Sequence, residues 1–230
     1  MTGAELKTFV EEGLDTGTIN ETWFYQALNV AKTKLEEIRN WKILEKVDAS
    51  KTALSSDTFL TTKALPTRFA LDIELFVIDS TGASPIYYTP IPSSRKYLYQ
   101  NSSNVYYVDL ANNVFALCGK VNGSKIINLV YKESSADIDE SSSWSFPSRF
   151  HPILGFMVGE MYRGGSDWDK INAQNLIQNR KDAMDLYDAM VAWDDSLKAR
   201  ELSNQYERTQ SFDNDGFAMG DQTGFDLGRL

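Results

Sequence analysis

The sequence predicts an α+β fold: an antiparallel helical bundle with an inserted small antiparallel β domain, a long C-terminal helix and an extended C-terminal arm. Apolar residues recur at helical spacing over about 20–46 and 170–207. The stretch between them alternates β-branched and aromatic residues with turn-forming residues. The expected division is 1–50 for the first bundle helices, 51–143 for the β domain, 144–208 for the last bundle helices and 209–230 for the arm.

The composition limits the chemistry that this chain can perform. One cysteine, Cys118, excludes an internal disulfide framework, and one histidine, His151, leaves zinc or non-haem iron without its usual ligands. The sequence contains no nucleotide-binding loop, nucleophile elbow or metalloprotease motif. We therefore expect no catalytic residues, no metal and no cofactor. No apolar run is long enough to cross a bilayer, and we expect synthesis in a reducing cytoplasm without a signal peptide.

The chain is acidic, with a net charge of −9 and a pI of about 4.7. This charge argues against tight, static binding of nucleic acid, which needs clustered lysine and arginine to displace counterions. An acidic surface still suits a wall past which DNA must slide without adhering. The simpler interpretation of the acidity, solubility, stays open.

Two helices are expected to open the chain. Residues Ala4–Leu14 predict a short amphipathic helix, and Thr18 with Glu21 has the spacing of a capping box that begins a second helix over about 20–46. The second helix needs a partner of similar length, and the 170–207 helix is the expected one. The apolar face of the second helix consists of Phe24, Ala27, Leu28, Ala31, Leu35, Ile38 and Leu44, whereas Lys34, Glu36, Glu37 and Arg39 are expected to face away.

The β segment shows several strand and turn signals. Ser84–Tyr99 contains three prolines and is expected to be a loop or an edge excursion. Asn122-Gly123 favours a type I′ turn, which would pair the strands on its two sides with Leu117 facing Asn128. Val105–Leu110 is expected to turn through 111–113 into Val114–Lys120, which makes a first hairpin and, with the strand after Gly123, a three-stranded meander. The other expected strands are Phe59–Thr62 and Phe69–Ile78.

A third helix is expected after Pro147, beyond an acidic, serine-rich loop at Glu133–Ser143. Gly155 and Gly159 lie four residues apart on one side of this helix. Glycine weakens a helix by ~1 kcal/mol relative to alanine. The pair therefore indicates either close approach of another backbone or two tolerated small residues.

The last helix is expected to be the longest element. At a rise of 1.5 Å per residue, its ~38 residues reach ~57 Å, whereas a compact body of this chain length has a diameter of ~45 Å. We therefore expect the helix to outrun its own domain and to be covered by another molecule.

Charged residues interrupt or flank the apolar stripe of this helix. Arg180 and Asp194 lie ~21 Å apart along it and cannot pair with each other. Each is expected to meet an opposite charge on the second helix or on a neighbouring subunit, or else to lie in water at the edge of the stripe. Asp182, Asp185 and Asp188 step by threes and indicate a solvated or channel-facing stripe rather than a catalytic cluster.

The helical pattern ends at about Thr209, and glycine, aspartate and asparagine then dominate. Bulky apolar residues still recur, which a purely flexible tail would not need. We expect them to anchor an extended arm on the surface of a partner. They are Phe212, Phe217, Met219, Phe225, Leu227 and Leu230.

The order of these parts carries a family resemblance. The motifs are Trp23-Phe24 and Arg39-Asn40-Trp41 in the first helices, Leu65-Pro66 with Phe69 before a strand, Trp144-Ser-Phe-Pro147 before a helix, and Tyr187 to Leu197 in the last helix. Over roughly Glu5 to Leu202, this order resembles the head-to-tail adaptor, or connector, proteins of tailed bacteriophages.

The resemblance implies a structural virion protein and not an enzyme. It implies a homo-oligomeric ring, commonly twelvefold, beneath the portal at the neck between capsid and tail, where it extends the DNA channel. C-terminal arms in that family dock on the portal protein, so the resemblance gives this role to the apolar residues after Ser211. Tail or nozzle proteins would bind below through the β domain or the helix loops, and genomic DNA would pass along acidic walls without adhering.

Two other classes of function stay open. The β domain would be a binding module if its tyrosines recognised a glycan or a host surface; exposed rings in a row would favour this function, and buried rings would oppose it. A carboxylate-dependent hydrolase would need a concave pocket with converging acids. The tyrosines are Tyr87, Tyr88, Tyr97, Tyr99, Tyr106 and Tyr107.

Overall fold

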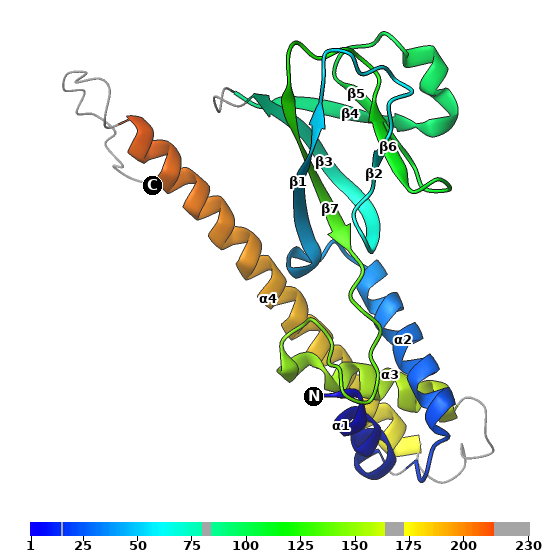
Figure 1. Cartoon of the computed structure of the whole chain (residues 1–230). Coiled ribbons are helices and arrows are strands. Elements are labelled where there is room, and N and C mark those ends of the chain that lie inside the picture. The colour runs from blue at the N-terminus through cyan, green and yellow to red at the C-terminus, as the bar shows by residue number, and fades with distance from the viewer. Residues whose placement is uncertain (15, 80–83, 164–172, 214–230) are drawn as a thin grey trace, which may run out of the picture.

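The computed structural model describes residues 1–14, 16–79, 84–163 and 173–213. Helices form a base at one end of the molecule, strands form a sheet domain (residues 45–133) at the other, and the last helix runs from the base to the level of the sheet (Figure 1). The helices are α1 (Gly3–Thr8), α2 (Glu21–Glu37), α3 (Pro152–Arg163) and α4 (Ala173–Asp213). We call α1, α2, α3 and the part of α4 that packs on α3 the helical base.

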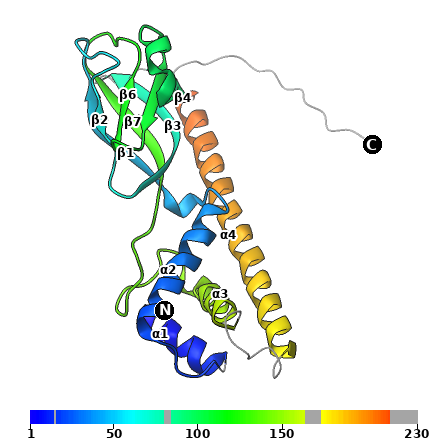
Figure 2. The same cartoon turned by 90° about the vertical axis from the view of Figure 1, so that its right-hand side faces the viewer.

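The sheet domain is larger and less regular than the sequence predicts. In the described part of the chain, seven strands form one mixed sheet in the order β1-β7-β3-β4-β5-β6-β2, which curls into a nearly closed, barrel-like domain (Figures 1 and 2). The predicted fold class, an antiparallel helical bundle with a small antiparallel β domain, is therefore wrong. The strands are β1 (Glu45–Ala53), β2 (Lys63–Ala64), β3 (Phe69–Asp79), β4 (Ile86–Pro92), β5 (Val105–Asp109), β6 (Val114–Leu117) and β7 (Lys125–Glu133).

Strand β1 explains part of this error. The sequence predicts helix to about residue 46, but α2 ends at Glu37, and β1 pairs with β7 in a register that places Val47 opposite Val130. Most of β1 is polar and exposed, so it lacks the alternation that marks a half-buried strand. Backbone pairing with β7 holds β1 in place. Phe59–Thr62, also predicted as a strand, forms turns before the short β2.

Strand β4 lies where the prolines predict a loop. It pairs antiparallel with β3 through Ile86–Tyr88 and then parallel with β5 through Thr89–Pro92. The Thr89 N–H donates to the Asn104 carbonyl at 2.8 Å, so strand alternation turns the nitrogens of Pro90 and Pro92 to the opposite side. The pairing with β3 ends at Tyr88, so the prolines remove no ladder hydrogen bond.

The two predicted hairpins have different outcomes. The β5–β6 hairpin is confirmed, with Tyr107 opposite Ala116 and a left-handed Asn113 (φ 53°) in its turn. The type I′ hairpin at Asn122-Gly123 is wrong: β6 pairs with β5 and β2, whereas β7 pairs with β1 and β3. Three strands separate β6 from β7 in the sheet. The connection between them therefore crosses the end of the curled domain instead of turning tightly.

The base and the sheet domain have separate apolar cores. The curled sheet encloses one core, and α1 to α4 enclose the other. The most buried residues of the sheet core include Leu75, Tyr106, Phe115, Ile127 and Leu129. Those of the base core include Leu6, Phe24, Leu28, Trp41, Leu154, Val158 and Met190.

Helix α3 lies between α2 and α4 in the base. The main helix–helix contacts are those of α2 with α3 and of α3 with α4, so the predicted lengthwise pairing of the second and last helices is wrong. With 17 residues, α2 is much shorter than α4. Asn20, rather than the predicted Thr18, caps α2 by accepting a hydrogen bond from the Trp23 N–H at 3.0 Å.

The two glycines of α3 face the N-terminal segment of the chain. A Cβ atom on Gly155 would lie 2.6 Å from Cδ1 of Phe9, and one on Gly159 would lie 2.8 Å from Cδ1 of Leu14. Both distances are too short for carbon atoms in contact, so a side chain at either position would force Phe9 or Leu14 to move. The neighbours that approach are side chains, whereas the sequence favoured either a backbone or no close neighbour.

Candidate assembly surface

The predicted long helix is confirmed. Helix α4 has 41 residues and so reaches ~62 Å at 1.5 Å per residue. It packs on α3 and on two short 3-10 helices, Lys42–Leu44 and Ser148–Phe150. Met190, which is fully buried, belongs to the base core. Beyond these contacts α4 continues past the base to the level of the sheet domain (Figure 2).

Asp194 anchors α4 to the segment that joins α2 to β1. Its side chain is 0% exposed and accepts hydrogen bonds from Nε of Arg39 at 3.1 Å and from the Lys42 N–H at 2.6 Å. Nζ of Lys198, one turn further along α4, lies 2.7 Å from the same carboxylate. Two cations and one backbone donor therefore compensate the buried charge, which is the condition for burying a carboxylate at low cost.

Arg180 lies nearer the start of α4 and pairs with Glu160 of α3. Nε of Arg180 donates to Oε1 of Glu160 at 2.8 Å, and both side chains are more than half exposed. The partner is therefore on α3 of the same chain. Because water screens exposed pairs, this one contributes at most about 1 kcal/mol to stability.

Helix α4 also carries an apolar row, which consists of Ile177, Met184 and Leu202. These side chains are 67%, 64% and 67% exposed. They are spaced 7 and 18 residues apart, close to two and five full turns, and so lie on one line along the helix. Single exposed apolar residues are common. Exposed Asp195 lies on the same line between Met184 and Leu202, so a charge interrupts the row, and its three apolar side chains remain exposed in the single chain.

A return segment, residues 134–147, runs along α2 from the end of β7 towards α3. Asn29 accepts from the Ile138 N–H at 2.8 Å and donates to the Ile138 carbonyl at 3.0 Å. Nζ of Lys32 donates to two carbonyls of the segment, each at 3.0 Å, and Glu36 accepts from Nε1 of Trp144 at 2.8 Å. Three polar residues on one face of α2 thus hold the segment in place.

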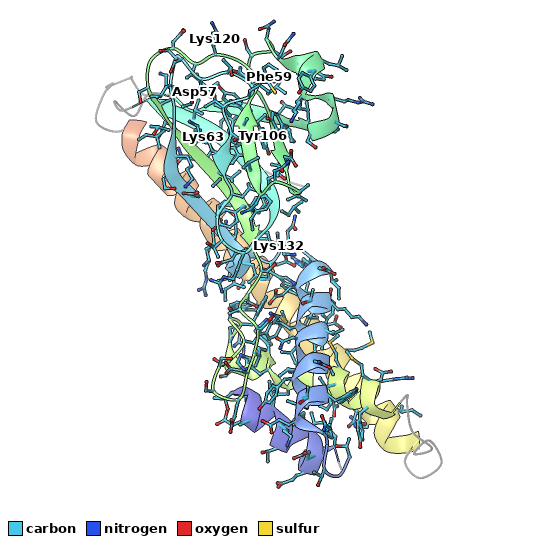
Figure 3. All side chains as sticks on the ribbon, turned by 45° about the vertical axis from the view of Figure 1, so that its right-hand side comes forward. Asp57, Phe59, Lys63, Tyr106, Lys120 and Lys132 are labelled. Atoms are coloured by element: carbon cyan, nitrogen blue, oxygen red, sulfur yellow. The ribbon has the colours of Figure 1, made fainter. Side chains whose placement is uncertain are left out.

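Lys132 connects the sheet domain to the end of α2. Its Nζ donates to the carbonyls of Glu36 and Arg39, where a cation compensates the unpaired C=O groups of a helix end. Burial lowers the pKa of Lys132 below the usual lysine value, and nearby Glu36 opposes this shift. Figure 3 shows Lys132 at the narrow region between sheet and helices. We call Glu36, Arg39, Lys132 and Asp194 the junction.

The residues predicted to dock on the portal are not placed by the structure. Phe217, Met219, Phe225, Leu227 and Leu230 lie outside the described residues. Phe212 belongs to the last turn of α4, and its side chain also lies outside the described part.

The acidic residues of α4 do not form a catalytic or metal-binding cluster in the described structure. Asp185 and Asp188 are exposed, and Asp182 accepts a hydrogen bond from Gln178 at 2.7 Å. In residues 1–14, 16–79, 84–163 and 173–213, no three His, Cys, Asp or Glu side chains are grouped to hold a metal ion. None of the described helices is both long and apolar enough to span a membrane.

The tyrosines of the sheet domain do not form one exposed row. Tyr88, Tyr106 and Tyr107 are buried, whereas Tyr87 and Tyr97 are exposed. Tyr106 donates to Asp72 from inside the sheet core, and burial together with this hydrogen bond raises its pKa above the usual value. Half of the predicted set of rings is therefore buried, which opposes a tyrosine-lined binding surface.

A hollow at the end of the sheet domain is the better candidate for a ligand site. It has a volume of about 380 Å³ and mainly polar lining residues. Figure 3 shows Phe59 and Lys120 at the end of the domain farthest from the helical base. None of the described residues that line this hollow carries a carboxylate, so the hollow gives no support to a carboxylate-dependent hydrolase. The lining residues are Thr58, Phe59, Gln100, Asn101, Ser103, Cys118 and Lys120.

No protein-family model matches this chain, and no curated protein matches it either. The function is therefore inferred from the geometry of the chain and from its motifs.

Asp194 is recognisable in the sequence, because its charge interrupts an apolar stripe, whereas the other buried charges were not predicted. The prediction that Glu36 faces away from the core is wrong, because its side chain is 4% exposed. Lys32 and Glu36 directly follow buried Ala31 and Leu35, so both lie at the edge of the buried face. Two opposite charges four residues apart at the edge of an apolar helix face are the sequence signal that could have identified Lys32 and Glu36 as buried.

Proposed function

We propose that this chain is a structural virion protein, a head-to-tail adaptor that forms a homo-oligomeric ring at the neck, joins the portal to the tail and extends the DNA channel. The observation that carries the proposal is α4. This helix is ~62 Å long, is anchored to the base at Asp194, and carries an apolar row that stays about two-thirds exposed. The order of sequence motifs supports the same family of proteins.

A ring accounts for the exposed row. Burial of apolar surface contributes roughly 25 cal/mol per Å², so the row gains stability only when another molecule covers it. In a ring with cyclic symmetry, each copy presents one surface and receives a different one from its neighbour, and the contacts close on themselves. A twelvefold ring is the expected form.

The charge distribution supports a channel role. The sheet domain contains nine Lys and Arg residues and eight Asp and Glu residues, whereas the rest of the chain contains fourteen and twenty-four. The excess of negative charge therefore belongs to the helices, their connections and the arm. A wall built from these parts would repel DNA phosphates and let the genome pass without adhering.

The arm and the sheet domain supply the remaining contacts in this proposal. The 17 residues after Asp213 span up to ~56 Å when extended, and their apolar residues would dock on the portal protein. The sheet domain or the loops of the base would contact the tail or nozzle protein. Neither contact involves a membrane.

Cryo-electron microscopy of the neck of the parent particle tests this function. We expect a ring of this chain between portal and tail, with α4 at the contact between copies. Native mass spectrometry of the purified protein is the complementary test, and twelve copies of the 26.0 kDa chain would give ~312 kDa. A neck whose density is fully accounted for by other proteins would overturn the proposal.

A pull-down tests the arm separately. Deleting residues 212–230 should leave a folded protein that no longer recovers the portal protein, because the apolar anchors are gone. Replacing Phe217 and Phe225 by serine in the full chain is the matched control for length. Unchanged recovery of portal by the truncated chain would contradict the role of the arm.

A second candidate function, glycan binding by the sheet domain, is favoured by the hollow beside Phe59. Its volume is in the range of ligand pockets, and it combines an aromatic ring with amides, hydroxyls and one ammonium group. A glycan array with the intact protein and the Phe59→Ala variant tests it. Binding that the variant loses supports this function, and an array without signal removes it.

A further inference from the structure

The outer face of α2 is an open surface opposite to the one that packs on α3. It lines a groove of about 670 Å³, and Val30 in this groove is 48% exposed. Among the described residues of the lining, the charged ones are Lys34, at one end of the α2 stretch, and Asp137, which already pairs with Lys32 at 3.0 Å. The lining residues are Thr22, Tyr25, Gln26, Asn29, Val30, Thr33, Lys34 and Asp137. Such a helix face fits another helix with an apolar stripe.

We infer that this groove receives the apolar row of α4 from a second copy of the chain, with Met184 against Val30. The inference rests on the proposed ring and names the two surfaces that build it. The axial spacings are similar, because Thr22 and Val30 are eight residues (~12 Å) apart on α2 and Ile177 and Met184 are seven residues (~10.5 Å) apart on α4. When Met184 lies on Val30 and the two helices run parallel, Ile177 lies nearly level with Thr22.

The charges near the contact select a parallel arrangement. Lys34 lies one turn beyond Val30. In an antiparallel arrangement it would be level with Arg180 and Lys181, which places three cations together. In a parallel arrangement Lys34 is level with Asp188, which carries the opposite charge. Salt screens such an attraction only partly when the two charges are less than about 8–10 Å apart. Asp188 and Lys34 are both exposed in the single chain.

The shape of the chain agrees with this arrangement. Both α2 and α4 run from the base towards the sheet domain (Figures 1 and 2). Rotation about an axis roughly along α4 preserves that direction in every copy, so α4 of one copy and α2 of the next run parallel in a ring. A ring whose axis runs roughly along α4 therefore gives the parallel pairing that the charges select.

Disulfide cross-linking between singly substituted chains tests the contact. A Val30→Cys chain is mixed with a Met184→Cys chain of different tag length under assembling conditions, oxidised, and run on a non-reducing gel. A disulfide between the two then reports a contact between copies, and native Cys118, 2% exposed, stays unreactive. We expect a heterodimer band at least fivefold stronger than that from Leu98→Cys with Met184→Cys, a control at the exposed sheet domain. The pair Thr22→Cys and Ile177→Cys should also cross-link, which an antiparallel arrangement would prevent.

The outcomes separate this inference from the proposed function. Ring formation with cross-linking of both pairs supports both. Ring formation without a Val30–Met184 cross-link overturns the inference and leaves the adaptor function intact. A particle neck that lacks this chain overturns both. A tail protein could cover the α2 face instead of a second copy. If the Val30→Cys chain cross-links only to a tail protein, the inference is also overturned.

Discussion

The helical base and the sheet domain are each held together by apolar burial, but they are joined to one another by charges. Each region encloses its own core. Between them lie buried or half-buried Glu36, Arg39, Lys132 and Asp194 with their hydrogen bonds. Apolar contact is tolerant of small rotations, whereas hydrogen bonds to buried charges are directional. The difference indicates that the angle between the two regions is specified by polar contacts.

The two regions can be followed separately in one experiment. The described tryptophans, Trp23, Trp41, Trp144 and Trp193, all belong to the base, and the sheet domain contains none. Tryptophan fluorescence therefore reports the base, and amide hydrogen exchange of β3 and β7 reports the sheet domain. Substitutions at the junction should change the tryptophan fluorescence more than the hydrogen exchange of β3 and β7.

The largest expected effect is that of Asp194→Ala. The substitution leaves Arg39 and the Lys42 N–H without their buried acceptor, so we expect a loss of ~3–5 kcal/mol in the free energy of unfolding. Urea unfolding followed by tryptophan fluorescence measures it. Asp195→Ala is the matched control, because that carboxylate is exposed and should cost less than ~1 kcal/mol. Equal losses in the two variants would show that Asp194 is not the anchor of α4.

A smaller effect is expected for Glu36→Ala. Nε1 of Trp144 and the polar groups of Ser135 lose their acceptor, which should cost ~2–3 kcal/mol. Hydrogen exchange should increase in residues 134–147, while β3 and β7 stay protected. Glu37→Ala, at the exposed neighbouring position, should change neither quantity. Uniform exchange across the whole chain in the Glu36 variant would mean that the junction does not act locally.

Gly155→Ala tests the base alone. The new methyl group would meet the ring of Phe9, so we expect a loss of ~1–2 kcal/mol that fluorescence detects. Adding Phe9→Leu removes the ring and should return part of that loss in a double-mutant cycle. Strictly additive effects of the two substitutions would rule out the close approach.

Tyr106→Phe tests the sheet domain alone and gives the smallest effect, ~1 kcal/mol at pH 8, from the lost hydrogen bond to Asp72. The pKa of Tyr106 is raised from its ordinary value of 10.0 in the folded state. Its contribution is therefore complete below pH 10 and is lost as the pH rises above it, because the unfolded chain then releases the proton first. The difference in unfolding free energy between natural chain and variant should stay constant up to about pH 9 and should shrink above pH 10 in urea unfolding. A difference that grows with pH would contradict the assignment.

The sequence was most informative where burial follows a simple period. The repeat of α4, the strand at Phe69 and the β5–β6 hairpin were predicted, because apolar spacing and turn residues mark each of them. It failed at β1 and β4. The first is a polar strand held by backbone pairing, and the second carries prolines at positions whose nitrogens face away from the ladder. Side-chain patterns alone do not reveal either arrangement, and missing both strands made the β domain look small.

The candidate site was predicted only in part for a related reason. The length of α4 indicated that a surface would be left uncovered, and Asp194 stood out against its apolar neighbours. Lys132 could not be recognised in this way. It lies near the end of a strand that is mostly apolar, and its ammonium group binds the end of a helix that is distant in the sequence. A charge that compensates the carbonyls of a different element has no local sequence signal.

The position of Asp194 within α4 gives the helix the properties of a lever. About 19 residues follow this carboxylate in the helix, so the free end lies ~28 Å from the pivot. A tilt of ~10° about the pivot would move that end by ~5 Å, about one helical turn. A force applied at the free end of α4 would therefore rotate the helix slightly about Asp194 and pull on the α2–β1 segment. The three partners of the Asp194 carboxylate would resist this rotation.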